Sequence, residues 1–101
     1  MTEVFISERA LRDFQRIAEF VEGHDPGGGG SRITAIVAAL DVLATSPRIG
    51  RPAAEGHREL IIGGGARGYV ALYAYLVRRD VVVIAAVRGQ REAGFGPDEE
   101  P

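Results

Sequence analysis

The 101-residue chain contains no cysteine, no lysine and no apolar run long enough to cross a membrane. Without cysteine, the chain can form neither disulfide bonds nor thiolate metal sites. A membrane-spanning helix needs about 20 consecutive apolar residues, and the first residues alternate polar and apolar instead of forming a signal peptide. We therefore expect a cytoplasmic protein that makes no membrane contact.

Histidine is scarce as well. His24 and His57 are the only two, and they are far apart in the sequence. They form no helical H-E-x-x-H pattern of the kind that binds zinc. We expect neither a metal ion nor another cofactor.

Because lysine is absent, all twelve basic residues are arginine. The arginine side chain is permanently charged and cannot act as a proton-transfer base near neutral pH. Residues 48–91 hold eight arginines against three acidic residues, although the net charge of the whole chain is −2. Such a locally basic segment suits an acidic protein partner or a confined phosphate contact better than extended binding to nucleic acid.

Length and composition predict one domain. Hydrophobic residues make up 46% of the chain, which is enough for one modest core in a chain of this length. We assign residues 1–95 to this domain and expect residues 96–101 to form a flexible acidic tail.

The first half of the sequence has the patterns of a strand and two helices. Residues 2–6 alternate polar and apolar, which predicts a short strand. Ser7 is a suitable N-cap for a helix whose apolar stripe continues to about residue 22. A glycine-rich loop follows, after which Ser31 can cap a second helix that Pro47 ends. Two such helices joined by a short loop predict an antiparallel hairpin.

The second half has strand patterns at residues 57–62, 68–77 and 81–88, which predict an antiparallel meander. In the middle strand, Val70 and Leu72 belong to one face and Tyr69 and Tyr73 to the other. We expect the helices to cover the Val/Leu face. The predicted fold is therefore α+β, with a short N-terminal strand and a helical hairpin on one face of a small antiparallel sheet, in the order β-α-α-β-β-β.

Five segments in this order resemble those of one protein family. They are residues 10–14 (ALRDF) with Ile17, residues 43–52 ending in SPRIGRP, residues 56–60 (GHREL), residues 68–73 (GYVALY) and residues 83–91 (VIAAVRGQR). Together they make the chain similar, over residues 3–95, to the RelE/ParE superfamily of bacterial toxins.

The resemblance implies a toxin of a type II toxin–antitoxin module, a group also known as plasmid stabilisation proteins. Such a toxin is neutralised in a hetero-oligomer with its cognate antitoxin, and operator DNA is contacted only through the antitoxin. RelE-like members are ribosome-dependent mRNA endoribonucleases. ParE-like members bind and inhibit DNA gyrase, generally without nuclease residues. A third alternative is a degenerate member that binds its partner but is not toxic.

The residues favour the ParE-like alternative, in which the protein is not an enzyme. RelE-like nucleases often have lysines before or within the second strand and a tyrosine or histidine near the C-terminus. This chain has no lysine, and Phe95 stands at the corresponding C-terminal position. If the chain is nevertheless an endoribonuclease, its catalytic residues would be His57, Arg58, Arg67 and Arg88.

The resemblance also implies two binding surfaces. The target-binding surface would contain Arg58, Arg67, Tyr69, Tyr73, Arg88, Arg91 and Phe95. The antitoxin-binding surface would contain Leu11, Phe14, Ile36, Leu40, Arg48 and Arg51, partly in a groove between the helices.

Overall fold

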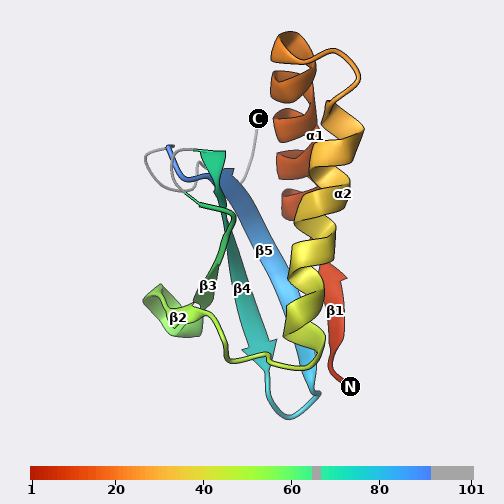
Figure 1. The fold of residues 1–101 in the computed structure, drawn as a ribbon. Coiled ribbons are helices and arrows are strands. Elements are labelled where there is room, and N and C mark those ends of the chain that lie inside the picture. The colour runs from red at the N-terminus through yellow and green to blue at the C-terminus, as the bar shows by residue number, and fades with distance from the viewer. Residues whose placement is uncertain (65–66, 92–101) are drawn as a thin grey trace.

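The computed structural model describes residues 1–64 and 67–91, and Phe95 and the acidic tail lie outside these ranges. The predicted α+β fold is confirmed (Figure 1). The helices are α1 (Glu8–His24) and α2 (Gly29–Leu40), and 3-10 turns follow at Asp41–Ala44 and Ala54–Gly56. The strands are β1 (Glu3–Ile6), β2 (Arg51–Pro52), β3 (Arg58–Ile62), β4 (Tyr69–Leu76) and β5 (Val81–Gly89).

The strands form one sheet in the order β1-β5-β4-β3-β2. Strands β3, β4 and β5 make the predicted antiparallel meander, and β1 joins it parallel to β5. The two-residue strand β2 at the opposite edge was not predicted, because a pair of residues is too short to show a pattern. None of the helices in the described ranges is long and apolar enough to span a membrane.

Helix α1 begins as predicted. The backbone amide of Ala10 donates a hydrogen bond to Ser7 Oγ at 3.1 Å, so the serine caps the first turn. The apolar stripe packs toward the sheet, and its buried members are Ala10, Phe14, Ile17 and Val21. This stripe places the opposite, polar side of the helix in water.

Helix α2 begins earlier than predicted, and Ser31 is not its cap. Instead, the Glu22 carboxylate of α1 accepts hydrogen bonds from the amides of Gly27 (2.8 Å) and Gly29 (2.7 Å). These bonds lower the pKa of Glu22. A Cβ on Gly29 would lie 2.8 Å from the Ala18 carbonyl oxygen, so glycine lets α2 start close against α1. The helix ends at Leu40 and a 3-10 turn follows, well before Pro47.

The helices cover the tyrosine face of β4 and not the Val/Leu face, so this prediction was wrong. Ala71 and Tyr73 are completely buried in the core with residues of both helices, and Tyr69 and Tyr75 pack against the same cluster. The Tyr73 hydroxyl finds polar partners in the connection between α2 and β2, which lets a tyrosine occupy the core. The Val/Leu residues of β4 lie on the opposite face, which α1 and α2 do not cover.

Candidate functional site

We call the side of the sheet that α1 and α2 do not cover the open face. The strand register assigns its residues, because directly paired residues share a face. Its members include Phe5, Ile61, Val70, Leu72, Ala74, Leu76, Val83, Ala86 and Arg88. Val70 and Ala86 are nearly fully buried, whereas Phe5, Ile61 and Leu76 are between 41% and 52% exposed.

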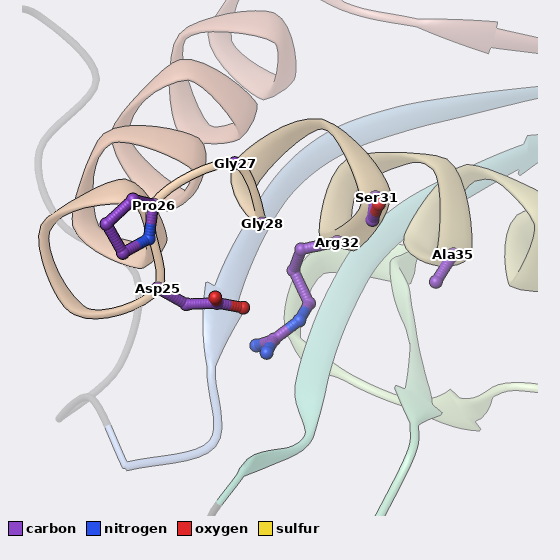
Figure 2. Close-up of a pocket in the computed structure, with 7 residues that line it drawn as sticks. All are labelled: Asp25, Pro26, Gly27, Gly28, Ser31, Arg32 and Ala35. Atoms are coloured by element: carbon purple, nitrogen blue, oxygen red, sulfur yellow. The ribbon is translucent and has the colours of Figure 1, made fainter.

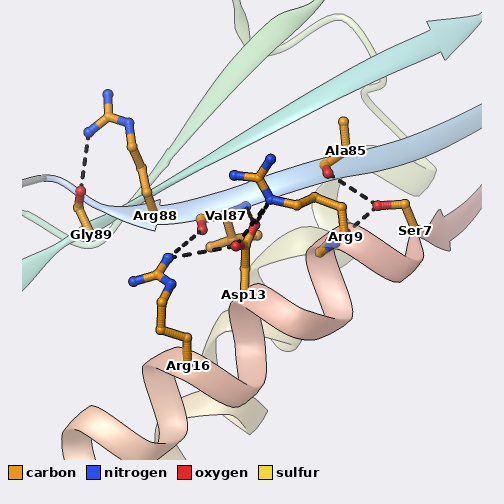
Figure 3. Close-up of polar contacts among 9 residues, drawn as sticks. Ser7, Arg9, Asp13, Arg16, Ala85, Val87, Arg88 and Gly89 are labelled. Atoms are coloured by element: carbon orange, nitrogen blue, oxygen red, sulfur yellow. Dashed lines mark hydrogen bonds and ion pairs between the residues drawn. The ribbon is translucent and has the colours of Figure 1, made fainter. Parts of the chain in front are cut away.

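A β-bulge brings Arg88 to this face. Leu72 pairs with Ala86 whereas Tyr73 pairs with Ile84, which leaves Ala85 as an extra residue in β5. Because side chains alternate along a strand, one extra residue inverts the faces of everything after it. Arg88 therefore pairs with Val70 on the open face, and Figure 3 shows its side chain extending from β5 away from α1.

The predicted nuclease cluster is not assembled on one face. Arg58 pairs with Tyr73 and belongs to the opposite side of the sheet from Arg88. Its guanidinium donates to the Gly50 carbonyl at 2.7 Å and to the Arg48 carbonyl at 3.3 Å, so it secures the connection before β2. His57 precedes β3 and is half-buried, and Arg67 precedes β4 and is exposed. Arg58, which was predicted for the same target-binding surface as Arg88, therefore lies on the other side of the sheet from it.

Tyr73 has a structural position. Its hydroxyl donates to the Pro47 carbonyl at 2.8 Å and accepts from the Gly50 amide at 2.9 Å. The side chain is 0% exposed, so we remove it from the target-binding residues. Tyr69 is half-buried, and its hydroxyl accepts a hydrogen bond from Arg32 of α2 at 2.7 Å. Both tyrosines thus hold other elements against the sheet.

Three residues predicted for the antitoxin-binding surface are also buried. Phe14, Ile36 and Leu40 are 6%, 1% and 2% exposed and belong to the core, so they line no open groove in this structure. Leu11 is half exposed on α1. Arg48 and Arg51 are also exposed. The remaining candidates for antitoxin contact are therefore separated: Leu11 lies on α1, Arg48 in the connection before β2, and Arg51 in β2.

Both of these arginines already contact the sheet. The Arg48 guanidinium lies 5.1 Å from the centroid of the Tyr75 ring, within the range of a cation–π contact. Arg51 Nε lies 3.0 Å from Glu59 Oε1 in an ion pair across β2 and β3. Exposed contacts of this kind contribute little to stability.

A shallow pocket lies where α1 turns into α2, which the sequence analysis did not anticipate. It encloses about 380 Å³ and is lined by Asp25, Pro26, Gly27, Gly28, Ser31, Arg32 and Ala35 (Figure 2). The glycine run at residues 27–30, where α2 begins, was the available signal. Among the described residues, no group of three acidic, histidine or cysteine side chains is arranged to hold a metal ion.

The polar residue that the sequence analysis missed is Asp13. It is 5% exposed on α1, and its carboxylate accepts a hydrogen bond from the Val87 amide just after the bulge in β5 (Figure 3). Asp13 stands beside the apolar stripe of α1, and this position could have indicated a buried carboxylate. A carboxylate in such a place needs hydrogen-bond donors, which points to a structural contact.

Comparison with known proteins identifies the family. A family model described as the ParE toxin of the type II toxin–antitoxin system parDE matches residues 4–94. The chain belongs to this toxin family. The toxin is also 33% identical to Toxin RelE3 of Caulobacter vibrioides over 91% of this chain and 98% of that protein. It is 36% identical to Toxin RelE1 of the same organism over 72% of this chain and 78% of that protein.

Two solved structures have the same fold as the toxin. A chain of the chromosomal ParDE system of P. aeruginosa superposes with a TM-score of 0.73 at 18% identity, covering 88% of the toxin and 96% of that chain. A chain of the intact RelBE toxin–antitoxin complex of E. coli superposes with a TM-score of 0.60 at 19% identity, covering 91% and 99%. The relatives carry both ParE and RelE names, so they support the superfamily and not one of its two activities.

Proposed function

We propose that this toxin acts in the ParE-like manner, by binding DNA gyrase in the cytoplasm and inhibiting it without cleaving RNA. In this proposal the target contacts the open face, with Arg88 as the charged anchor and Arg67 and Arg91 at the same end of the sheet. A cognate antitoxin neutralises the toxin and mediates any contact with operator DNA.

The observation that carries this proposal is the chemistry of the open face. Cleavage of RNA at a ribose hydroxyl needs a proton-transfer pair and fixed cations around one phosphate. The strand positions that the register assigns to this face are mainly aliphatic, and none of them is histidine, lysine or tyrosine. Its acids are Glu3 and Glu59, and Glu59 is held in an ion pair with Arg51 at 3.0 Å. Arg58 and Arg88 also lie on opposite sides of the sheet, so these two cations do not surround one phosphate.

The same features suit contact with a protein. Protein interfaces have an apolar centre, and arginine is enriched among the residues that contribute most to binding. Phe5, Leu76 and Ile61 supply exposed apolar area, and Arg88 supplies a permanent positive charge. The match of the ParE family model over residues 4–94 adds support from sequence.

The RelE-like alternative keeps one specific observation in its favour. Both curated relatives are named RelE toxins, and one of them aligns over nearly its whole length. In that alternative His57, Arg58, Arg67 and Arg88 would have to gather around an mRNA on the ribosome. The toxin would then have to change the position of Arg58 relative to Arg88.

Antitoxin contact is proposed for the exposed members of the predicted set, which are Leu11, Arg48 and Arg51. An acidic and partly apolar antitoxin segment would complement them, because it supplies carboxylates for the two guanidinium groups. By register Arg51 shares the open face with Arg88, through its pairing with Glu59, so variants of Leu11 and Arg48 are the ones that test antitoxin binding apart from target binding.

The test is inhibition of gyrase supercoiling by the purified toxin, with cleavage of ribosome-bound mRNA measured in parallel. We expect inhibition of supercoiling with intact mRNA, and at least a tenfold loss of potency for Arg88→Ala, which is the effect of losing about 1.4 kcal/mol of binding. Arg79→Ala, in the exposed turn between β4 and β5, is the matched control and should retain full potency. Rapid mRNA cleavage without gyrase inhibition would establish the RelE-like alternative instead.

A further inference from the structure

Strand β5 extends beyond its neighbour β1. The parallel ladder between them ends where Ile6 pairs with Ile84, and the Ser7 amide then donates to the Ile84 carbonyl at 3.0 Å. From Ala85 to Gly89, no described strand lies on that side of β5. Backbone groups along such a strand edge need other partners.

Side chains of α1 and of its N-cap, Ser7, take the place of the missing strand (Figure 3). Ser7 Oγ donates to the Ala85 carbonyl at 3.1 Å. Asp13 Oδ2 accepts from the Val87 amide at 2.9 Å, and Arg16 Nη2 donates to the Val87 carbonyl at 3.3 Å. Both backbone groups of Val87 are thereby bound by α1, directly after the bulge that reorients β5.

The Asp13 carboxylate is itself held between two arginines of the same helix. Arg9 Nε lies 3.3 Å from both carboxylate oxygens, and Arg16 Nη2 lies 3.7 Å from Oδ1. The spacing of residues 9, 13 and 16 places the three side chains on neighbouring turns of one helical face. A buried carboxylate with these charged donors is a rigid acceptor for the Val87 amide.

We propose that Asp13 is a positioning residue of the toxin, which fixes the β-bulge and thereby keeps Arg88 on the open face. The inference rests on the proposed function only for the role of Arg88 in target binding. Without the Asp13 acceptor, the Val87 amide loses its partner on α1, and this segment is held there only through the Ala85 and Val87 carbonyls among the hydrogen bonds described above. Arg88 still pairs with Val70, but its part of β5 is held less firmly, so ordering it on target binding costs free energy.

The first test measures hydrogen exchange of two amides in β5 of the toxin–antitoxin complex. Asp13→Ala should speed exchange of the Val87 amide about tenfold or more, because a charge-assisted hydrogen bond is lost. The Val82 amide, in the part of β5 that lies between β1 and β4, should change much less. Glu19→Ala removes an exposed acid of the same helix and should leave both amides unchanged. Equal acceleration at Val87 and Val82 would overturn the proposal, since it would mean general destabilisation.

The second test links the clamp to Arg88. Gyrase inhibition is measured for Asp13→Ala, Arg88→Ala and the double variant, with Asp13→Asn as a conservative variant that keeps an oxygen acceptor for Val87. If Asp13 acts through Arg88, the double variant should be no weaker than Arg88→Ala alone, and Asp13→Asn should recover part of the potency. Additive losses would show that Asp13 does not act through Arg88. If Arg88→Ala alone has no effect on the target, the proposed binding surface fails, whereas exchange at Val87 still decides whether Asp13 holds the bulge.

Discussion

Replacing Tyr73 by phenylalanine removes one oxygen atom from the core and leaves two backbone groups without their partner. These are the buried Gly50 amide and the half-buried Pro47 carbonyl, which now bind the hydroxyl at 2.9 and 2.8 Å. An unsatisfied buried polar group costs about 1–3 kcal/mol, and the partly exposed carbonyl costs less because water reaches it. We therefore expect Tyr73→Phe to lower the free energy of unfolding by about 2–3 kcal/mol.

The measurement is urea unfolding of toxin that has been separated from its antitoxin and refolded. A loss of this size lowers the melting temperature of a domain of this length by roughly 10–20 °C and moves the urea midpoint by about 1–2 M. The control is Tyr75→Phe, whose hydroxyl donates to Asp80 at 2.9 Å near the surface. Asp80 keeps Thr2 as a second donor, so the control should change the midpoint much less. Equal losses in the two variants would refute the reasoning from burial.

Three further predictions concern the helical hairpin and the open face. Gly29→Ala should lower the free energy of unfolding by about 1–3 kcal/mol, since its Cβ would lie 2.8 Å from the Ala18 carbonyl oxygen. Gly30→Ala meets open space in the same helix and should raise it by about 0.5–1 kcal/mol, and urea unfolding compares the two. Hydrogen bonds from the amides of Gly27 and Gly29 lower the pKa of Glu22 below its ordinary value of 4.5. The ionised Glu22 carboxylate therefore stabilises the fold above that pH, and this contribution is lost as the pH falls through the lowered pKa. The stability difference between the native toxin and Glu22→Gln should therefore shrink in urea titrations repeated from about pH 7 to about pH 3, and a difference independent of pH would contradict this. Ala74→Arg should weaken gyrase inhibition at least tenfold with an unchanged urea midpoint, and full potency would show that the target does not contact this part of the sheet.

The alternation of β4 revealed two faces but not which one is buried. Val70, Leu72 and Leu76 looked like the core face because they are purely aliphatic. The structure buries Tyr73 instead, because its hydroxyl is satisfied by Gly50 and Pro47, which lie more than twenty residues earlier. The sequence of the strand does not indicate partners at that distance. The strand pattern alone therefore could not predict which face of β4 is buried.

The start of α2 was missed for a similar reason. Ser31 has the properties of a cap, and a local reading has no means of preferring a carboxylate from another helix. Glu22 satisfies the amides at the start of α2, and Gly29 permits the approach. By contrast, Ser7 and the stripe of α1 were predictable because cap and helix are adjacent in the sequence.

For the candidate site, the sequence predicts Arg88 as a target-binding residue, and this stays a prediction, but the sequence did not indicate what surrounds Arg88. The extra residue Ala85 is an ordinary member of an apolar run, so the bulge cannot be seen in the sequence. A regular strand would place Arg88 on the same face as Ile84, toward the helices. Arg58, predicted for the same surface as Arg88, lies on that covered face, which only the strand register reveals.

The parallel pairing of β1 with β5 determines when the chain can finish folding. Thr2 and Asp80, which are hydrogen-bonded beside this ladder, are 78 positions apart. During synthesis the first strand must therefore wait until nearly the whole polypeptide has left the ribosome, since a contact between distant segments forms only after the loop between them exists. A chain interrupted before residue 81 would have no partner for β1 and no last strand to carry Arg88. The strand that carries Arg88 is therefore among the last parts of the sheet to form, and β1 remains unpaired until that strand has been made.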